Sequence, residues 1–414
     1  MKEYLISLKE INKKNILKLV IEKGPISRVS ISRLIKISRP TITAYINELI
    51  QDGLVKEIGK ADSTPYGGKR AVLLKFNSDA GYILGVMIGV NTIRICLSDL
   101  SSKIIKIVKV PTEEWLGPEA IINKIIKGSN DIIKSTSINK ENIIGIGIGA
   151  TGLVDSNAGV VIFSPNLTGW CNIRLEEIIG ERLKIPAYIE NECRVQAIAE
   201  KIYGLAKNSS NFVCVETGIG IGTGVFINNK LLVGNKGMAG EIGHIITNIS
   251  GNKTCHCGDV GCLETLCSIR SLIENIREDI KGGRKSMVKV SGEMEISDLS
   301  KLYKQGDEVI TRRVEENARY LGIGISNAIK MFNPEIVIIH GKVIEFGEEY
   351  LKIVKEAVCQ NTFPKVRDGY NIQLSKLGED VGLIGATSIV FENVFGLNNL
   401  NIADEYIIKK NVDV

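Results

Sequence analysis

The sequence lacks any run of about eighteen uncharged apolar residues, the length that a membrane-spanning helix requires. Its lysine-bearing start, MKEYLISLKEINKKNILKLV, lacks the apolar core and small-residue cleavage site of a secretory signal peptide. The nine cysteines of the 414-residue chain are an odd number and most are scattered, which is poor material for a disulfide framework. These absences argue against membrane and secreted proteins, and we expect a soluble, cytoplasmic protein in a reducing compartment.

The net charge is also small, at +5 overall, but it is distributed unevenly along the chain. Residues 1–75 contain fifteen Lys or Arg and seven Asp or Glu, a balance of +8, so the remaining residues carry −3. A chain of this length with 44% apolar residues is expected to form two or three domains, each able to bury a core. A basic first module is typical of a domain that binds a polyanion, although a solvated helical surface gives the same count.

The basic module has the pattern of three short helices. Residues 11–21 place apolar side chains at helical spacing until a Gly-Pro pair ends the pattern. A second helix is expected at 28–35, and a third from a cap at Ser38 to about residue 52. Pro40 then lies in the first turn of the third helix, where its missing N–H is not needed. Two helices joined by a short turn predict a helix-turn-helix.

Strand-like segments at 54–58 and 71–76 follow these helices, and GKADSTPYGGKR joins them as a hairpin with a basic tip. They complete a winged helix-turn-helix, which we expect over residues 1–76. The third helix would address base edges in the major groove, and the wing would contact phosphates or the minor groove. Candidate DNA-contacting residues are Ser38, Arg39, Pro40, Thr41, Thr43, Tyr45, Asn47, Lys69 and Arg70. A protein-interaction domain with a basic face is the alternative.

A compact motif, GEIGHIITNISGNKTCHCGDVGCLE, covers residues 240–264. It gathers one imidazole and three thiols, those of His244, Cys255, Cys257 and Cys262. Zn²⁺ favours these groups in a tetrahedral shell, and four protein ligands leave no position for an activated water. We therefore predict a structural zinc ion that holds the loop in shape. His256 is a second option for the histidine ligand, and buried cysteines without a metal are the alternative to the site itself.

From residue 82 onward, buried-strand patterns end in glycine-rich turns. YILGVMIGVNTIRICLSDL at 82–100 and NFVCVETGIGIGTGVFINNKLLVG at 211–234 share one design, which suggests a duplicated fold. Amphipathic helical segments, such as 118–134 and 315–332, lie between the strands. This alternation predicts an α/β body of two similar lobes with a cleft between them.

In its motifs the chain resembles the ROK family of repressors and sugar kinases, and within it the xylose-repressor-like regulators. The resemblance spans about residues 12 to 395 and rests on the helix-turn-helix segment with its GGKR wing, SPNLTGW, IENE, GIGIGTG, GEIGH, CHCGDVGCLE, NPEIVIIHG and GLIGATSI. It implies a winged helix-turn-helix followed by an actin-like, sugar-kinase (ribonuclease H-like) body, and a homodimer or homotetramer. We expect a first lobe at 77–190, a second lobe with the zinc loop at 191–400, and a tail at 401–414.

The same resemblance implies a set of sugar-contacting residues: Asn166, Asn191, Glu192, Glu241, His244 and Glu264. Carboxylates and amides suit vicinal hydroxyls, and His244 would serve the zinc with one ring nitrogen and a sugar with the other. Glu241 and Glu264 bracing the zinc loop alone is the alternative. Trp170 would either cover an apolar sugar face or belong to the core.

Kinase chemistry needs a base, a Mg²⁺-binding carboxylate and groups that hold phosphates. Compared with the family pattern, Met87 replaces an aspartate of the first phosphate motif, Ile219 replaces a threonine of the second, and Glu192 replaces the aspartate base. The sequence therefore predicts no enzyme but a sugar-sensing repressor that leaves a palindromic operator when a monosaccharide such as xylose or glucose binds. Activation by the sugar stays open, and an ATP-dependent sugar kinase with an appended DNA-binding module is the alternative.

Overall fold

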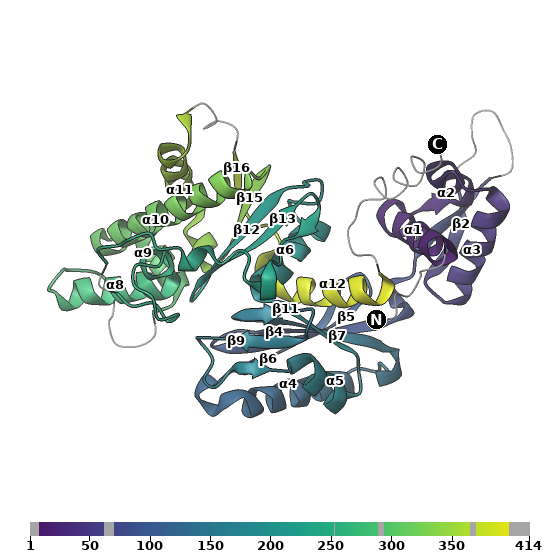
Figure 1. The fold of residues 1–414 in the computed structure, drawn as a ribbon, viewed down its shortest axis with the longest axis horizontal. Coiled ribbons are helices and arrows are strands. Elements are labelled where there is room, and N and C mark those ends of the chain that lie inside the picture. Colours follow the sequence, from purple (N-terminus) through teal and green to yellow (C-terminus); the bar gives the residue numbers. More distant parts are fainter. Residues whose placement is uncertain (1–7, 62–69, 252, 289–293, 365–369, 397–414) are drawn as a thin grey trace.

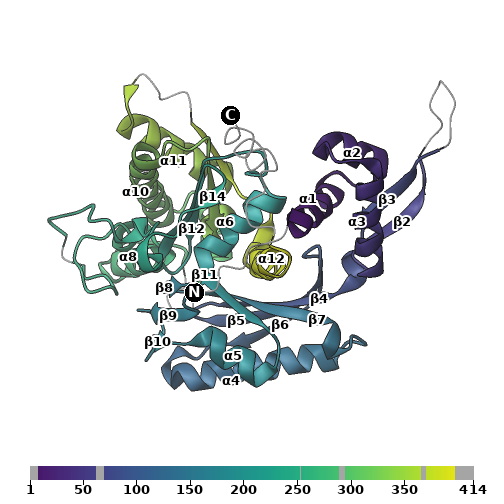
Figure 2. The same cartoon turned by 45° about the vertical axis from the view of Figure 1, so that its right-hand side comes forward.

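The computed structural model describes residues 8–61, 70–251, 253–288, 294–364 and 370–396. A small helical domain precedes a body of two α/β lobes, and it lies beside the end of helix α12 (Val381–Phe395) in both overall views (Figures 1 and 2). Within the described ranges, no helix is both long and apolar enough to cross a membrane.

Three helices and a three-stranded sheet form the amino-terminal domain. They are α1 (Leu8–Lys23), β1 (Ile26–Ser27), α2 (Arg28–Ile35), α3 (Arg39–Gln51), β2 (Val55–Lys60) and β3 (Val72–Phe76). The sheet order is β1-β3-β2, and both pairings are antiparallel. The domain has its own core, whose fully buried members include Ile16, Ile31, Ile42, Ile46 and Leu74. The predicted winged helix-turn-helix is confirmed, with α1 beginning three residues earlier than the apolar pattern.

Side-chain caps explain where the two helices of the helix-turn-helix begin. Ser27 Oγ accepts from Ser30 N at 3.1 Å, and Ser38 Oγ accepts from Thr41 N at 3.4 Å. Each serine thus satisfies an N–H group that the first helical turn leaves free. Pro40 occupies the first turn of α3, as the sequence predicts.

The first lobe is built on a five-stranded sheet with the order β11-β7-β4-β5-β6. Its strands are β4 (Tyr82–Ile88), β5 (Thr92–Asp99), β6 (Ile104–Pro111), β7 (Ile143–Ala150) and β11 (Ala187–Asn191). Helices α4 (Gly117–Lys134) and α5 (Leu175–Leu183) cover its outer face (Figure 1). A small antiparallel sheet joins this lobe, made of β8 (Leu153–Asp155), β9 (Val160–Phe163) and β10 (Cys171–Ile173).

The second lobe repeats this topology, with the strand order β14-β13-β12-β15-β16. Its strands are β12 (Phe212–Thr217), β13 (Ile221–Ile227), β14 (Lys230–Leu231), β15 (Ile336–Gly341) and β16 (Asn371–Leu374). Its helices are α7 (Glu264–Cys267), α8 (Ile269–Lys281), α9 (Ile296–Lys304), α10 (Glu308–Phe332) and α11 (Gly347–Asn361). In each lobe three antiparallel strands are extended by two parallel ones. The duplication that the sequence suggests is therefore present.

Helices α6 (Glu192–Tyr203) and α12 lie between the two sheets (Figure 1). Helix α6 packs on the second sheet, α12 packs on the first, and the two helices pack on each other. A Cβ atom at Gly147 of β7 would lie 1.7 Å from the Ala386 carbonyl oxygen of α12, and one at Gly385 would lie 1.8 Å from that of Val195 in α6. These two glycines serve close packing. The first lobe thus takes its inner covering helix from the end of the segment 191–400.

Candidate functional site

The outer face of α3 carries most of the residues expected to contact DNA. Five of these side chains are exposed: Ser38, Arg39, Pro40, Thr43 and Asn47. Thr41 and Tyr45 are half-buried, and Tyr45 packs against the domain core. Arg70 is the first described residue after the tip of the wing, and Lys69 lies outside the described residues. A patch of polar side chains therefore begins at the amino end of α3 and follows the helix.

Arg39 and Asn47 differ in how they are held. Asn47 Oδ1 accepts from Arg28 Nη2 at 3.3 Å, and Arg28 Nη1 lies 2.8 Å from Glu57 Oε1 on β2. Arg28 thus ties α2 to α3 and to the wing, a role that sequence reasoning missed because its partners lie in other elements. The Arg39 side chain makes no hydrogen bond or ion pair with any described residue. An exposed guanidinium in this position is available to a phosphate or a base edge.

One imidazole and three thiols converge in the loop between β14 and α7. The ligand atoms of His244, Cys255, Cys257 and Cys262 all lie within 4.8 Å of one another. His244 Nδ1 is 3.6 Å from Cys255 Sγ, and Cys257 Sγ is 3.7 Å from Cys262 Sγ. A tetrahedral zinc site with Zn–S bonds of about 2.3 Å has ligand edges of about 3.8 Å, so the spacing fits this ion. His256 is exposed and does not belong to the cluster.

Without a bound ion, the thiols of Cys255 and Cys262 in this cluster hold their protons at neutral pH. Burial raises the pKa of Cys255 to about 11, with the charge of Glu264 adding to the effect, and burial also raises the pKa of Cys262. A bound divalent cation reverses this, because a coordinating thiol is deprotonated. Gly261 shapes the loop: its φ is +88°, and a Cβ atom there would lie 2.2 Å from the Asn248 carbonyl oxygen.

Three carboxylates from separate elements lie near one another beside this loop. Glu192 opens α6, Glu241 stands directly before the 3-10 turn η5 (Ile242–His244), and Glu264 opens α7. Burial raises the pKa of Glu192 to about 7, and the charges of Glu241 and Glu264 add to the shift. Burial raises the pKa of Glu241 as well, against the lowering effect of His244. Such a group suits neutral hydroxyls, which both donate and accept hydrogen bonds, and it repels anions.

Glu264 also has structural contacts. Its Oε2 accepts from Ile221 N at 2.9 Å, and its Oε1 lies 3.7 Å from Cys255 Sγ. It thereby joins the zinc loop to the glycine-rich turn between β12 and β13. A Cβ atom at Gly220 in that turn would lie 2.4 Å from Glu264 Oε2, so glycine is required for the approach. Bracing of the loop, the alternative role for Glu264, does not exclude a contact with a sugar. Oε2 is engaged by the backbone of Ile221, whereas Oε1 lies beside the thiol cluster at the longer distance.

Sequence reasoning missed Glu216, a carboxylate on β12 behind Glu192. Burial raises the pKa of Glu216 to about 8, the charge of Glu192 adds to this, and a hydrogen bond from Gln196 opposes it. Its position within the strand could have been read from the sequence, since an acidic residue stands in the apolar run FVCVET. The proximity to Glu192 is a product of the tertiary fold.

Arg194 is a second missed residue, and it is 1% exposed. Its Nε donates to Glu190 Oε1 at 2.6 Å, Nη1 to the Gly237 carbonyl oxygen at 2.8 Å, and Nη2 to that of Val154 at 2.8 Å. A buried guanidinium with three partners of this kind is well compensated. It fastens the segment leading to Glu241 onto the first lobe. A charged residue on the buried side of α6 was the available signal.

Asn191 serves as the cap of α6. Its Oδ1 accepts from Cys193 N at 2.9 Å and Arg194 N at 3.2 Å, and its Nδ2 donates to the Gly152 carbonyl oxygen at 2.8 Å. Both polar groups are therefore engaged by the protein, so a sugar hydroxyl would have to share them.

Asn166 lies in the loop between β9 and β10, and its Oδ1 accepts from Arg270 Nη2 at 3.1 Å. Arg270 belongs to α8 of the other lobe, so this hydrogen bond crosses between the lobes. Trp170, in the same loop, is 1% exposed and packs in the core of the first lobe. The core alternative therefore holds for Trp170, whereas Asn166 is half-buried and hydrogen-bonded to the other lobe.

The phosphate-motif positions are occupied by packing contacts. Met87 fills the space between β7 and α12, since Cβ atoms at Gly149 and Gly382 would lie 2.4 Å from its Sδ and 2.8 Å from its Cε. The Thr217 hydroxyl in the second turn donates to the His340 carbonyl oxygen, and Ile219 is half-buried. The Met87 thioether offers no negative charge to Mg²⁺. The proton of the Thr217 hydroxyl is donated to the His340 carbonyl oxygen and is not free to bind a phosphate.

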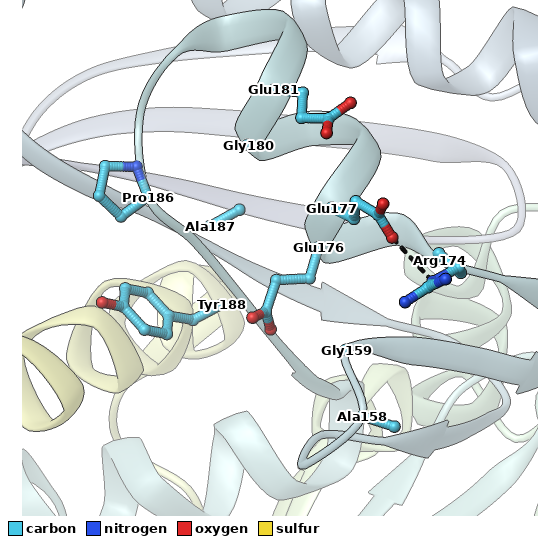
Figure 3. A pocket seen from close by; sticks show the side chains of 10 residues that line it. All are labelled: Ala158, Gly159, Arg174, Glu176, Glu177, Gly180, Glu181, Pro186, Ala187 and Tyr188. Atoms are coloured by element: carbon cyan, nitrogen blue, oxygen red, sulfur yellow. Dashed lines mark ion pairs between the residues drawn. The ribbon is translucent and has the colours of Figure 1, made fainter. Parts of the chain in front are cut away.

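A separate surface hollow of about 520 Å³ lies between α5 and β11 (Figure 3). Glu176, Glu177 and Glu181 line it, and the ion pair between Arg174 and Glu177 closes one side at 2.7 Å (Figure 3). None of the residues expected to bind DNA, sugar or zinc lines this hollow, so it is separate from the carboxylates and the His244–Cys262 loop.

Comparison with known proteins agrees with this arrangement. A family profile described as the ROK family matches residues 83–393, and one described as winged helix-turn-helix DNA-binding matches residues 9–56. A xylose repressor of Caldicellulosiruptor bescii is 34% identical over 390 residues, which cover 94% of this chain and 97% of that protein.

Two crystal structures extend the comparison. A ROK family transcriptional regulator, a homolog of the Escherichia coli MLC protein, matches with a TM-score of 0.81 and 26% identity, covering 94% of this chain and 97% of that one. A ROK family glucokinase from Streptomyces griseus, solved with glucose and AMPPNP, matches with a TM-score of 0.68 and 28% identity. It covers 75% of this chain and 99% of its own, so the likeness to the kinase leaves out a quarter of this chain.

Proposed function

We propose that this chain, which belongs to the ROK family, is a DNA-binding transcriptional repressor whose two-lobed body senses a neutral monosaccharide. The observation that carries the proposal is the joining of an intact winged helix-turn-helix to a body with an acidic site beside a cluster of one imidazole and three thiols. Arg39, at the start of α3, has no side-chain partner among the described residues. The match to a xylose repressor over 94% of the chain supports the same assignment.

The charge of the site supports a neutral sugar as the ligand class. Glu192, Glu241 and Glu264 gather in one region, and burial raises the pKa of Glu192 to about 7. The guanidinium of Arg194 opposes the rise that burial causes in the pKa of Glu241, but Arg194 is itself paired with Glu190. Hydroxyl groups can donate to these carboxylates, whereas a phosphate or carboxylate on the ligand would be repelled. Xylose and glucose both have this character, and xylose is the first to test because of the named relative.

Zinc is assigned a structural role. His244 Nδ1 faces Cys255 Sγ, which leaves Nε2 of the same ring to donate toward a sugar hydroxyl. With four protein ligands the ion would carry no substrate and activate no water. It would hold the positions of Glu241, His244 and Glu264 relative to one another.

A continuous packed route leads from the site to the DNA-binding domain. Glu192 opens α6, α6 packs on α12, and the Phe391 ring of α12 meets the Phe76 ring of β3 edge-on at a centroid distance of 5.8 Å. A cavity of about 740 Å³, lined in part by Lys18 and Tyr203, lies between the domain and the body. Sugar binding that closes the lobes would shift α12 and release the DNA, provided that the sugar favours the state that does not bind DNA.

The proposal includes an oligomeric state and a cellular location. A homodimer or homotetramer would place two α3 helices on a palindromic operator, one helical turn of DNA or a multiple apart. A repressor acts where the chromosome is, which in a bacterial cell is the cytoplasm. A sugar kinase with an appended DNA-binding domain is the competing function, and Met87 together with the engaged Thr217 hydroxyl argues against it.

The test combines selection of DNA with a panel of sugars. The full chain is used to select duplexes from a random library, and fluorescence anisotropy then follows release of the selected duplex by D-xylose, D-glucose, D-galactose and N-acetyl-D-glucosamine. We expect a palindromic consensus and release by at least one sugar, with Glu241→Ala abolishing release while keeping DNA affinity. Selection without a consensus, or ATP-dependent phosphorylation of a sugar at ordinary kinase rates of about 1 to 100 s⁻¹, would refute the proposal.

A further inference from the structure

We propose that Arg270 is a positioning residue of the sugar site: from the second lobe it fixes the amide of Asn166 in the first lobe, so that Asn166 Nδ2 donates to the sugar. This inference rests on the proposed sugar-binding function. The contact that carries it is the hydrogen bond of 3.1 Å from Arg270 Nη2 to Asn166 Oδ1, between residues 104 positions apart in the sequence.

Both residues of this hydrogen bond lie on segments whose backbone is held by further hydrogen bonds, as the surroundings of Arg270 show. Arg270 is the second residue of α8, and Ser268 Oγ caps this helix by accepting from Ser271 N at 3.1 Å. The buried Asn317 of α10 donates its Nδ2 to the Cys267 carbonyl oxygen at 2.9 Å, which fixes the backbone just before the helix. The base of the Arg270 side chain is therefore held by two neighbouring elements.

The loop that carries Asn166 is compact as well. Ser164 N donates to the Trp170 carbonyl oxygen at 3.1 Å, and Trp170 N donates to that of Leu167 at 3.2 Å. The side chains of Leu167 and Trp170 are 2% and 1% exposed, so they anchor the loop in the core of the first lobe. Asn166, by contrast, is only half-buried and points its amide out of this loop to Arg270.

The chemistry of arginine determines which end of the amide faces the sugar. A guanidinium has donors and no acceptor, so it can pair only with Oδ1 of Asn166, never with Nδ2. Nδ2 has no hydrogen-bond partner among the described residues, and it is the group left to bind a ligand. The carboxylates of Glu192, Glu241 and Glu264 accept hydrogen bonds from a sugar. Asn166 Nδ2 would add a donor to this set of acceptors.

The same hydrogen bond links the first lobe to the second. A sugar that accepts from Asn166 Nδ2 and donates to Glu264 would bridge the lobes in parallel with Arg270. Loss of Arg270 would free the amide to rotate and would remove this hydrogen bond between the lobes. Arg270 therefore affects sugar affinity without touching the sugar.

The experiment measures sugar affinity of the full chain by calorimetry, with D-xylose, D-glucose, D-galactose and N-acetyl-D-glucosamine as probes. Arg270→Leu is expected to weaken binding of the responsive sugar by about three- to tenfold, the effect of one hydrogen bond. Arg270→Lys keeps one donor and is expected to recover part of the affinity. Arg277→Leu, on the same helix but without a hydrogen bond or ion pair to any described residue, is the matched control and should bind like the wild type.

Two variants of Asn166 separate positioning from folding. Asn166→Asp keeps an acceptor for Arg270 and loses the Nδ2 donor, so it should lose affinity although the bridge between the lobes remains. In the double variant Arg270→Leu, Asn166→Ala, affinity should equal that of Asn166→Ala alone, because the arginine acts only through the asparagine.

The outcomes distinguish the two proposals. If the wild-type chain binds none of the four sugars, the proposed function fails and this inference fails with it. If the wild type binds a sugar and Arg270→Leu binds it within twofold as well, the positioning role of Arg270 is refuted while the proposed function stands. Multiplying losses in the double variant would likewise refute action through Asn166.

Discussion

Replacement of Glu216 by glutamine tests whether the buried carboxylates behind the sugar site destabilise the fold at high pH. Glu216 lies on β12, where it is half-buried, with the charge of Glu192 nearby. Gln196 donates to it, and Gln196 Oε1 has no partner among the described residues. Glutamine keeps the shape of the side chain, accepts the same hydrogen bond, can donate to Gln196 Oε1, and carries no charge at any pH.

The sign and the size of the effect follow from the pKa of Glu216, which burial raises from 4.5 to about 8. Between these values the folded state holds a proton that the unfolded state has lost, so the free energy of unfolding falls as the pH rises through this window. At 1.36 kcal/mol per pKa unit the ceiling is about 5 kcal/mol. Partial access to solvent reduces this, and we expect the stabilisation by Glu216→Gln to grow by about 2 to 4 kcal/mol between pH 5 and pH 9.

The assay is urea-induced unfolding of both proteins at pH 5, 7 and 9, followed by circular dichroism, with the zinc content held equal. Glu181→Gln on the exposed face of α5 is the control, and it should show no such trend. A difference between Glu216→Gln and wild type that stays constant with pH would refute the argument. A variant less stable than the wild type at pH 9 would show that the Glu216 charge is compensated in the fold.

Three further predictions concern zinc, DNA and the junction between the domains. Cys257→Ser should lose the bound zinc, measured by inductively coupled plasma mass spectrometry, and should weaken the sugar response while DNA affinity stays within twofold; retained zinc would contradict the assigned ligand set. Arg39→Ala should weaken binding of the selected duplex by about 1 to 3 kcal/mol in anisotropy titrations, and equal affinity would remove Arg39 from the DNA contacts. Phe391→Ala removes the ring contact with Phe76 and should leave DNA affinity intact while reducing release by the sugar, so full release would exclude α12 as the connecting element.

Much of the amino-terminal domain could be predicted because its signals are local. The cap at Ser38 and the proline in the first turn mark the start of α3, and both lie within three consecutive residues. The spacing of apolar residues along the helices identifies the core. The His244, Cys255, Cys257 and Cys262 cluster was predictable for the same reason: three cysteines in eight residues converge through one tight loop. His244 is predicted as the fourth member because GEIGH lies shortly before the same loop in the sequence.

The sugar site was only partly predictable. The resemblance gave the residue set, but not the engagement of Asn191 as a helix cap or the burial of Trp170 in the core. Glu216, Arg194 and Arg270 had no motif, because each acts on a partner from a distant segment. A hydrogen bond between residues 104 positions apart leaves no periodic trace in the sequence.

By itself, then, the sequence determined the order of the domains, the duplicated α/β pattern, the recognition helix and the cluster of one histidine and three cysteines. These features follow from interactions between near neighbours in the chain, where spacing, capping and side-chain type suffice. Tertiary structure alone decided that α12 returns to the first lobe, that three carboxylates share one buried region, and that Arg270 reaches Asn166 across the lobes. These features depend on how the two lobes pack, because burial and electrostatic coupling are properties of distances in space that the linear order of residues does not contain.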